Sequence, residues 1–136
     1  MSALTKEWIK AANDDILIIE QIISIEHLTH MVAFHSQQAI EKVLKSLIEE
    51  FEIDIPKIHK LTKLNKILQN KISIDNKEIL VRLDELYIDS RYPGEMGLLP
   101  NGKPTVDDAK EFYNFALETF KKVCKILDID ILEVRI

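Results

Sequence analysis

Glycine and proline are confined almost entirely to one short stretch of this 136-residue chain. All three glycines and three of the four prolines lie between Arg91 and Pro104. Because proline removes a backbone donor and glycine disfavours a regular helix, no helix or strand is expected to cross this stretch. On either side of it, apolar residues recur every three to four positions, which is typical of helices with one buried face. The sequence therefore predicts an all-α fold interrupted by one loop.

The apolar spacing predicts four long helices and one short one. They cover about residues 4–24, 28–51, 60–70, 76–91 and 105–127. In the last of these, Thr105 and Asp108 have the spacing of a capping box. Side chains expected to point inward include Trp8, Ile16, Phe51, Leu61, Leu64, Ile67, Leu68 and Phe112. We expect a single up-and-down bundle of four to five helices over residues 1–127.

The tail, residues 128–136, alternates apolar and charged side chains. This pattern fits either a strand or a frayed helix, and both stay open. Apolar side chains at a chain end rarely stay in water, so the tail is expected to pack on the bundle or to pair with a second copy of the chain.

The composition argues against several classes of protein. A hydrophobic content of 46% is enough for one core, and a net charge of −5 argues against a protein that coats DNA, although it permits a local basic patch. Cys124 is the only cysteine, so neither an intramolecular disulfide nor a thiolate zinc site is expected. The N-terminal residues lack the layout of a signal peptide, and no apolar run reaches the roughly 18 residues of a membrane span. We expect a soluble, cytoplasmic protein.

Asp84, Tyr87 and Arg91 are three and four residues apart at the end of the fourth predicted helix, so they share one helix edge. A carboxylate and a phenol at this spacing orient a guanidinium, whose planar fork binds phosphate oxygens. Tyr92 adds a ring on which a nucleobase stacks. The alternative is structural: Asp84 and Arg91 form an ion pair at the helix end while Tyr87 fills the core. Both interpretations stay open.

Three polar residues fall on apolar helix faces: Asp15 in the first predicted helix, and Gln37 and Glu41 in the second. A polar group buried without a partner costs roughly 1–3 kcal/mol, so each must find one. Lys45 follows Glu41 by four residues in the favourable acid-before-base order, and the two can pair along the helix. These residues either lock the core or line a cavity.

A run of lysines contains no acidic residue between Asp54 and Asp75. It is either a basic patch that attracts a nucleic-acid backbone or an acidic partner protein, or simply the solvated face of a short helix. Its members are Lys57, Lys60, Lys63, Lys66 and Lys71.

The histidines do not have the spacing of a closed metal site, and the glycines do not form a phosphate-cradling motif after a strand. We therefore predict no metal and no bound cofactor. His59 precedes a helix start and is expected to hydrogen-bond a neighbouring backbone group or carboxylate, while His35 is expected to lie far round its helix from the core.

Four segments of the chain resemble the HEPN family, in the family's order and over residues 4–127. They are Trp8, Ala12 and Asp15; the run from Phe34 to Lys45, with its Gln-Gln-Ala-Ile-Glu-Lys; Ile58 to Leu61; and Tyr87 with Ser90, Arg91, Tyr92 and Pro93. The resemblance implies a helical bundle that usually forms a homodimer, binds nucleotide or RNA, and is often encoded beside a minimal nucleotidyltransferase in a toxin–antitoxin-like pair. On the matched positions it implies nucleotide or phosphate contacts by Arg91, Tyr92, Tyr87, Asp84, Lys42, Lys45 and His59.

A large branch of that family consists of metal-independent ribonucleases in which an Arg is followed, after four to six residues, by a His. After Arg91 these positions hold Met96, Gly97 and Leu98, none of which transfers a proton. Loss of the acid–base group costs RNA cleavage roughly 10²–10⁴-fold. The leading hypothesis is therefore a non-catalytic module that binds nucleotide or RNA and partners a minimal nucleotidyltransferase. The alternatives are a ribonuclease toxin with a displaced acid–base residue, such as His59, and a dimer that serves only protein interaction.

Overall fold

The structure of the chain, a computed structural model, describes residues 1–54, 57–90 and 103–134. Within these ranges there are helices and turns but no strand. A short 3₁₀ helix, η1 (Glu26–Leu28), joins the first two long helices. The helices are α1 (Ala3–Ile22), α2 (Thr29–Glu50), α3 (Leu61–Ile67), α4 (Lys77–Ser90), α5 (Val106–Ile126) and α6 (Ile131–Val134). The predicted all-α bundle is confirmed, and the five predicted segments correspond to α1–α5.

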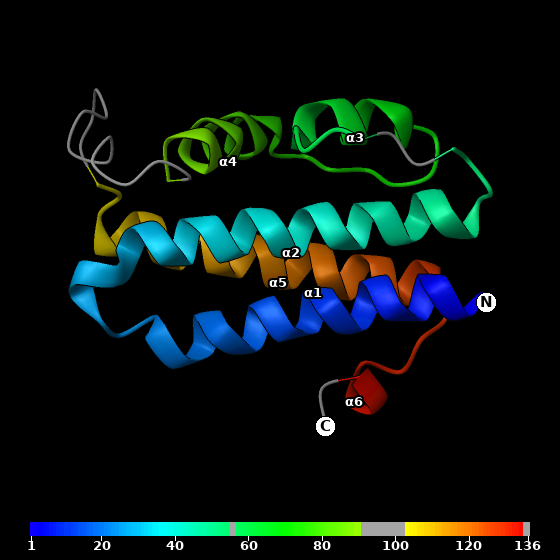
Figure 1. Ribbon diagram of the computed structural model, residues 1–136, viewed down its shortest axis with the longest axis horizontal. Coiled ribbons are helices and arrows are strands. Elements are labelled where there is room, and N and C mark those ends of the chain that lie inside the picture. The colour runs from blue at the N-terminus through cyan, green and yellow to red at the C-terminus, as the bar shows by residue number, and fades with distance from the viewer. Residues whose placement is uncertain (55–56, 91–102, 135–136) are drawn as a thin grey trace.

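The second helix, α2, lies at the centre of the bundle, as Figure 1 shows. It packs against α1 and α5 on one side and against α3 and α4 on the other. The helices α1 and α2 run antiparallel, α5 lies behind them, and α3 and α4 form a second layer above. One side of α2 therefore lies between α4, above it in Figure 1, and α1, below it.

The helix ends follow local sequence signals. Ser2 caps α1, since its Oγ accepts a hydrogen bond from the backbone N–H of Thr5 at 3.0 Å. At the start of α5, Thr105 Oγ1 accepts from the N–H of Asp108, and the Asp108 carboxylate accepts from the N–H of Thr105. This is the predicted capping box, which satisfies two backbone donors that a helix start otherwise leaves unpaired.

The core forms where the apolar faces of the five longer helices meet around α2. Aliphatic side chains of α1 and α2 pack with Phe112 and Phe120 of α5 and with the leucines of α3. The fully buried side chains include Ile16, Ile19, Ile40, Leu44, Leu47, Leu61, Leu64, Leu68, Phe112 and Phe120.

Two expected core residues lie at the surface. Phe51 is 36% exposed because it is the C-cap of α2, where the backbone leaves the helix, and the ammonium of Lys71 lies 4.8 Å from its ring centroid. Ile67 is 41% exposed because α3 is shorter than predicted and ends at this residue, with Leu68 turned into the core in its place. Both wrongly predicted residues lie at a helix end, Phe51 as the C-cap of α2 and Ile67 as the last residue of α3.

The tail forms the single-turn helix α6, so the strand alternative was wrong. Ile131 and Val134 pack against the core from a half-buried position, beneath α1 in Figure 1. The backbone carbonyl of Val134 accepts a hydrogen bond from Asn13 Nδ2 at 3.0 Å, which ties the tail to α1. None of the helices described is long and apolar enough to cross a membrane.

Candidate functional site

Gln37, Glu41 and Lys45 lie one turn apart along α2 and form a buried polar ladder. Gln37 Nε2 donates to Glu41 Oε1 at 3.2 Å, and Lys45 Nζ donates to Glu41 Oε2 at 3.1 Å. Lys45 is held on its other side by the ring of Trp8, 5.7 Å from the ammonium to the ring centroid. The pairing of Glu41 with Lys45 along the helix is confirmed, and it compensates two charges that are almost completely removed from water.

The same ladder reaches across to the segment that precedes α3. Gln37 Nε2 also donates to the backbone carbonyl of His59 at 2.8 Å, and His59 Nδ1 lies 3.2 Å from Glu41 Oε1. The His59 side chain is 54% exposed, and its Nε2 makes no hydrogen bond with any residue the structure describes. Because Nδ1 faces the carboxylate, Nε2 is the ring nitrogen available to a ligand.

A second polar cluster joins α1 to α2 around Asp15. His35 Nδ1 lies 2.9 Å from Asp15 Oδ1, and Lys42 Nζ lies 2.6 Å from Asp15 Oδ2. The Asp15 carboxylate is buried, and each of its oxygens has a cationic or hydrogen-bonding partner. The prediction that His35 lies far from the packed side of α2 was wrong: its side chain is only 16% exposed, because α1 covers that side.

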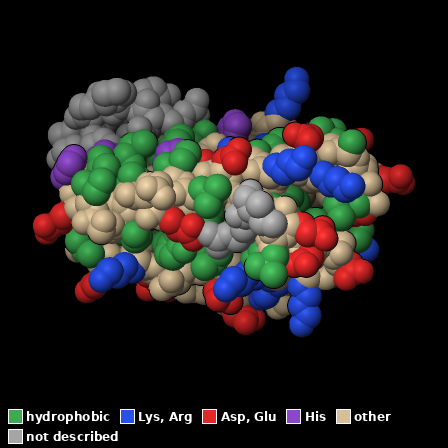
Figure 2. Space-filling model, turned by 90° about the horizontal axis from the view of Figure 1, so that it is seen from below, with side chains coloured by type: hydrophobic (Ala, Val, Ile, Leu, Met, Phe, Trp, Pro, Cys, Tyr) green, Lys and Arg blue, Asp and Glu red, His purple; other side chains and the backbone are tan. Residues whose placement is uncertain are grey.

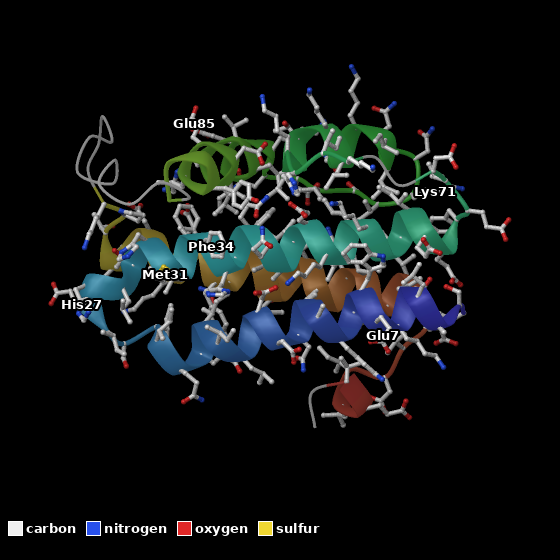
Figure 3. The ribbon with its side chains drawn as sticks, in the orientation of Figure 1. Glu7, His27, Met31, Phe34, Lys71 and Glu85 are labelled. Atoms are coloured by element: carbon white, nitrogen blue, oxygen red, sulfur yellow. The ribbon has the colours of Figure 1, made fainter. Side chains whose placement is uncertain are left out.

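Three rings lie side by side where α4 crosses α2. Phe34 and Tyr87 are stacked, with ring centroids 5.7 Å apart and planes at 21°, and His59 lies 5.9 Å from Tyr87 at a tilted angle. Figure 3 shows Phe34 in the space between α2 and α4. We call Phe34, Tyr87 and His59 the ring row. Phe34 and Tyr87 are half-buried and His59 is exposed, so the row opens at the His59 end.

Asp84, one turn before Tyr87, holds the start of α3. Its Oδ1 accepts from the N–H of Leu61 at 2.7 Å, and its Oδ2 accepts from both the N–H and the hydroxyl of Thr62. The residue before α3, Lys60, offers no side-chain cap, so a carboxylate from α4 takes that place. Arg91 and Tyr92 lie outside the residues described, so the predicted pairing of Asp84 with Arg91 stays a prediction.

The structure therefore brings together His59, Glu41, Gln37, Lys45 and Tyr87 along one side of α2. Lys42 is also on α2, but its ammonium pairs with Asp15 of α1, at the contact between these two helices. Both lysines expected to contact phosphate are held in ion pairs, and the Lys45 side chain is only 8% exposed. Phosphate contacts by these two lysines stay a prediction.

Two partners were missed from sequence. The sequence places Phe34 in the family motif but does not predict that it stacks on Tyr87. It also does not predict that His35 pairs with Asp15. The sequence contained a signal for the second contact. His35 and Lys42 are seven residues apart and therefore lie on the same face of α2. Asp15, in the apolar stripe of α1, contacts both of them on this face.

In the described part of the chain, no group of three or more His, Cys, Asp or Glu side chains that could hold a metal ion comes together. Cys124 is buried, and this burial raises the pKa of its thiol to about 11, so the thiolate that binds metals or attacks electrophiles is scarce near neutral pH.

An open groove of about 950 Å³ lies between α1 and the tail, and no residue of the ring row lines it. Lys6 and Lys10 line it together with Asp14, Asp130 and Glu133. Figure 2, which views the molecule from below, shows acidic and basic side chains interspersed with hydrophobic ones on this face. Such a mixed lining favours no single class of ligand.

Residues 5–127 match the HEPN domain family. Among solved structures, the crystal structure of an archaeal HEPN homologue is similar, with a TM-score of 0.69 and 27% sequence identity over 92% of this chain and 99% of that one. No curated protein matches the chain. The family match spans all five of the longer helices, and the chain therefore belongs to the HEPN domain family.

Proposed function

We propose that this HEPN chain is a non-catalytic module that binds nucleotide or single-stranded RNA at the side of α2 that faces α4. The observation that carries the proposal is the ring row, whose exposed end is a histidine held in place by Glu41. Stacking of a base on an aromatic ring contributes about 1–3 kcal/mol to the binding free energy, and every base can stack in this way. The Nε2 of His59 adds a group that hydrogen-bonds a base edge or a phosphate oxygen.

Arg91 and Tyr92 complete the proposal from sequence, since they directly follow α4 in the chain. In this account the guanidinium of Arg91 binds a phosphate, and Tyr92 offers a further ring. The absence of a histidine after Arg91 favours binding over cleavage.

A short fluorescein-labelled RNA tests the proposal by fluorescence anisotropy. His59→Ala is expected to weaken binding by about 5-fold to 150-fold, which corresponds to the loss of one stacked base. His27→Ala is the matched control, because His27 is also exposed but lies in η1, away from α3 and α4. Equal affinities of wild type and both variants would overturn the proposed site.

We also propose two kinds of protein partner. The first is a minimal nucleotidyltransferase, which the HEPN family membership supports. Co-purification of the two chains from one expression strain tests this, and loss of all RNA binding without loss of that complex would favour a module that serves only protein interaction.

The second partner is a copy of the chain. Leu4, Ala11, Ile18 and Ile25 recur every seven residues along α1 and the turn after it, and each is exposed or half-buried. Apolar residues at this spacing are typical of a helix that packs against another helix. This stripe supports a homodimer.

A specific observation favours one competing function, a metal-independent ribonuclease. His59 and Glu41 form a carboxylate–histidine pair like those that orient catalytic bases. In such a reaction, Nε2 of His59 takes the proton of the ribose 2′-hydroxyl, the 2′-oxygen bonds to phosphorus, and the 5′-oxygen leaves and takes a proton from water. Cleavage in EDTA that is lost in His59→Ala would establish this alternative.

A further inference from the structure

The cations of the ring-row side of α2 are already neutralised. Lys45 pairs with Glu41, and Lys42 pairs with Asp15. A nucleic-acid strand carries one negative charge per nucleotide, so a strand that lies on the ring row needs unpaired cations next to it. The described residues supply such cations where the chain enters α3.

Lys57, Lys60, Lys63 and Lys66 follow one another at intervals of three residues, and we call them the lysine row. All four are exposed, and none forms an ion pair with a residue that the structure describes. No acidic residue occurs in the chain between Asp54 and Asp75. Figure 3 shows long side chains with nitrogen tips standing away from the body of the protein above α3.

This arrangement works against the stability of α3. Lys60 and Lys63 at the start of α3 oppose the helix dipole, and Lys63 repels Lys66 three residues later, whereas Lys66 itself lies in the last turn, where a cation is favourable. The helix has only seven residues, and its start is held by Asp84 from α4. The backbone N–H groups of Leu61 and Thr62 already donate to Asp84, so an anion that relieves this repulsion binds the lysine side chains.

The lysine row is continuous with the ring row. His59 lies in the chain between Lys57 and Lys60, and its ring is the exposed end of the ring row. Within α3, Lys63 and Lys66 are separated by a rise of about 4.5 Å, which is on the order of the roughly 3.4 Å per nucleotide along a stacked strand, while Lys57 and Lys60 lie in the segment before the helix. Rings that stack bases and lysines that neutralise phosphates thus follow one another on one path.

We propose that the ligand of this module is a single-stranded oligonucleotide, not a mononucleotide, whose backbone runs from the ring row along the lysine row before and within α3. This inference rests on the proposed function and gives it a substrate class. The phosphates interact with the lysines as point charges, so the path carries no sequence preference of its own. An acidic protein could bind the same lysines, but it has no bases to stack on the adjoining rings.

The test compares two triple variants that change the net charge equally. Lys60→Glu/Lys63→Glu/Lys66→Glu reverses three of the four charges of the lysine row, and Lys110→Glu/Lys121→Glu/Lys125→Glu reverses three exposed lysines of α5 that also form no ion pair with a described residue. The probes are fluorescein-labelled oligouridines of 3, 6 and 12 nucleotides, with uridine monophosphate as an unlabelled competitor. Circular dichroism checks that both variants are folded, and the Lys→Gln triple replaces the first variant if it is not.

For wild type, affinity is expected to rise with probe length and to fall steeply with salt. The lysine-row variant is expected to bind the 12-nucleotide probe at least about tenfold more weakly, with a log–log salt slope smaller by about 2, because each lost phosphate contact removes about 0.7. Its affinity for uridine monophosphate, and all affinities of the α5 variant, are expected to stay within about twofold of wild type.

Three outcomes would overturn the inference, and they are distinguishable. Equal losses in the two triple variants would mean that only net charge matters. Binding of uridine monophosphate and RNA without dependence on length would leave the proposed function intact and remove the lysine row from it. No binding of any nucleotide, with capture of a poly-glutamate peptide that the lysine-row variant loses, would overturn both and assign the row to an acidic protein.

Discussion

His59 and Glu41 lie on different elements, yet Nδ1 of the imidazole is 3.2 Å from Oε1 of the carboxylate. The same carboxylate holds Gln37 and Lys45 of its own helix, so one buried acid fixes both the interior of α2 and the chain that enters α3. This contact places an exposed ring beside Tyr87 with one nitrogen directed at a fixed partner.

Gln37→Ala is expected to destabilise the protein by about 1–3 kcal/mol, because it removes hydrogen bonds to Glu41 and to the His59 carbonyl at a fully buried position. Urea denaturation measures the change. Gln21→Ala, at an exposed position of α1, is the control and should stay within about 0.5 kcal/mol of wild type. Unchanged stability together with lost RNA binding would show that Gln37 acts on the ligand instead.

Asp84→Ala is expected to fray α3, because the backbone donors of Leu61 and Thr62 lose their acceptor. Hydrogen exchange of α3 amides should accelerate, and global stability should fall by about 1–3 kcal/mol. Glu85→Ala is the matched control, since Glu85 is exposed and points away from the body of the protein in Figure 3. Exchange in α3 that stays as slow as in wild type would contradict the assigned role of Asp84.

Ile18→Lys is expected to convert the proposed dimer to a monomer. Ile18 is 42% exposed and belongs to the apolar stripe that recurs every seven residues along α1. A charge at this position has to be desolvated when two helices pack. Light scattering after size exclusion measures the mass. Val81→Lys introduces the same charge at a position 45% exposed on α4 and should leave the mass unchanged. A wild-type protein that is monomeric at high concentration would remove the dimer from the account.

The capping box of α5 predicts a dependence of stability on acid. The backbone N–H of Thr105 donates to Asp108 and is the main cause that lowers the pKa of this carboxyl, with help from the Thr105 hydroxyl and Arg82. A carboxyl with a lowered pKa in the folded state stabilises the protein above its unfolded pKa, and this contribution is lost as the pH falls through its folded pKa. The stability difference between wild type and Asp108→Asn should therefore shrink below about pH 4. A constant difference from pH 7 to pH 2 would contradict this role.

Local signals in the sequence account for much of the fold and for part of the site. The spacing of Thr105 and Asp108 predicts the α5 cap, and that of Glu41 and Lys45 predicts their ion pair, because both contacts form within one helix. Phe51 and Ile67 were placed wrongly because helix ends are set by which residues the rest of the fold can bury.

Contacts between elements were harder to foresee. The carboxylate of Asp84 caps a helix that begins 23 residues earlier, and His35 meets Asp15 across the boundary between α1 and α2. Spacing within one helix says that such a residue needs a partner, but only the packing of the helices selects it. The sequence therefore marks Asp15 as a polar residue that needs a partner, but it does not identify His35 as that partner.

One gel tests the central claim, that this module holds RNA at the ring-row side of α2 without cutting it. Wild type, Arg91→Ala, His59→Ala and the control His27→Ala are incubated with end-labelled single-stranded RNA in EDTA and run under native and denaturing conditions. The account predicts a native shift with wild type and His27→Ala, a weaker shift with the other two variants, and intact RNA on the denaturing gel throughout. RNA that is cleaved by wild type but not by His59→Ala, or RNA that no protein shifts, would contradict it.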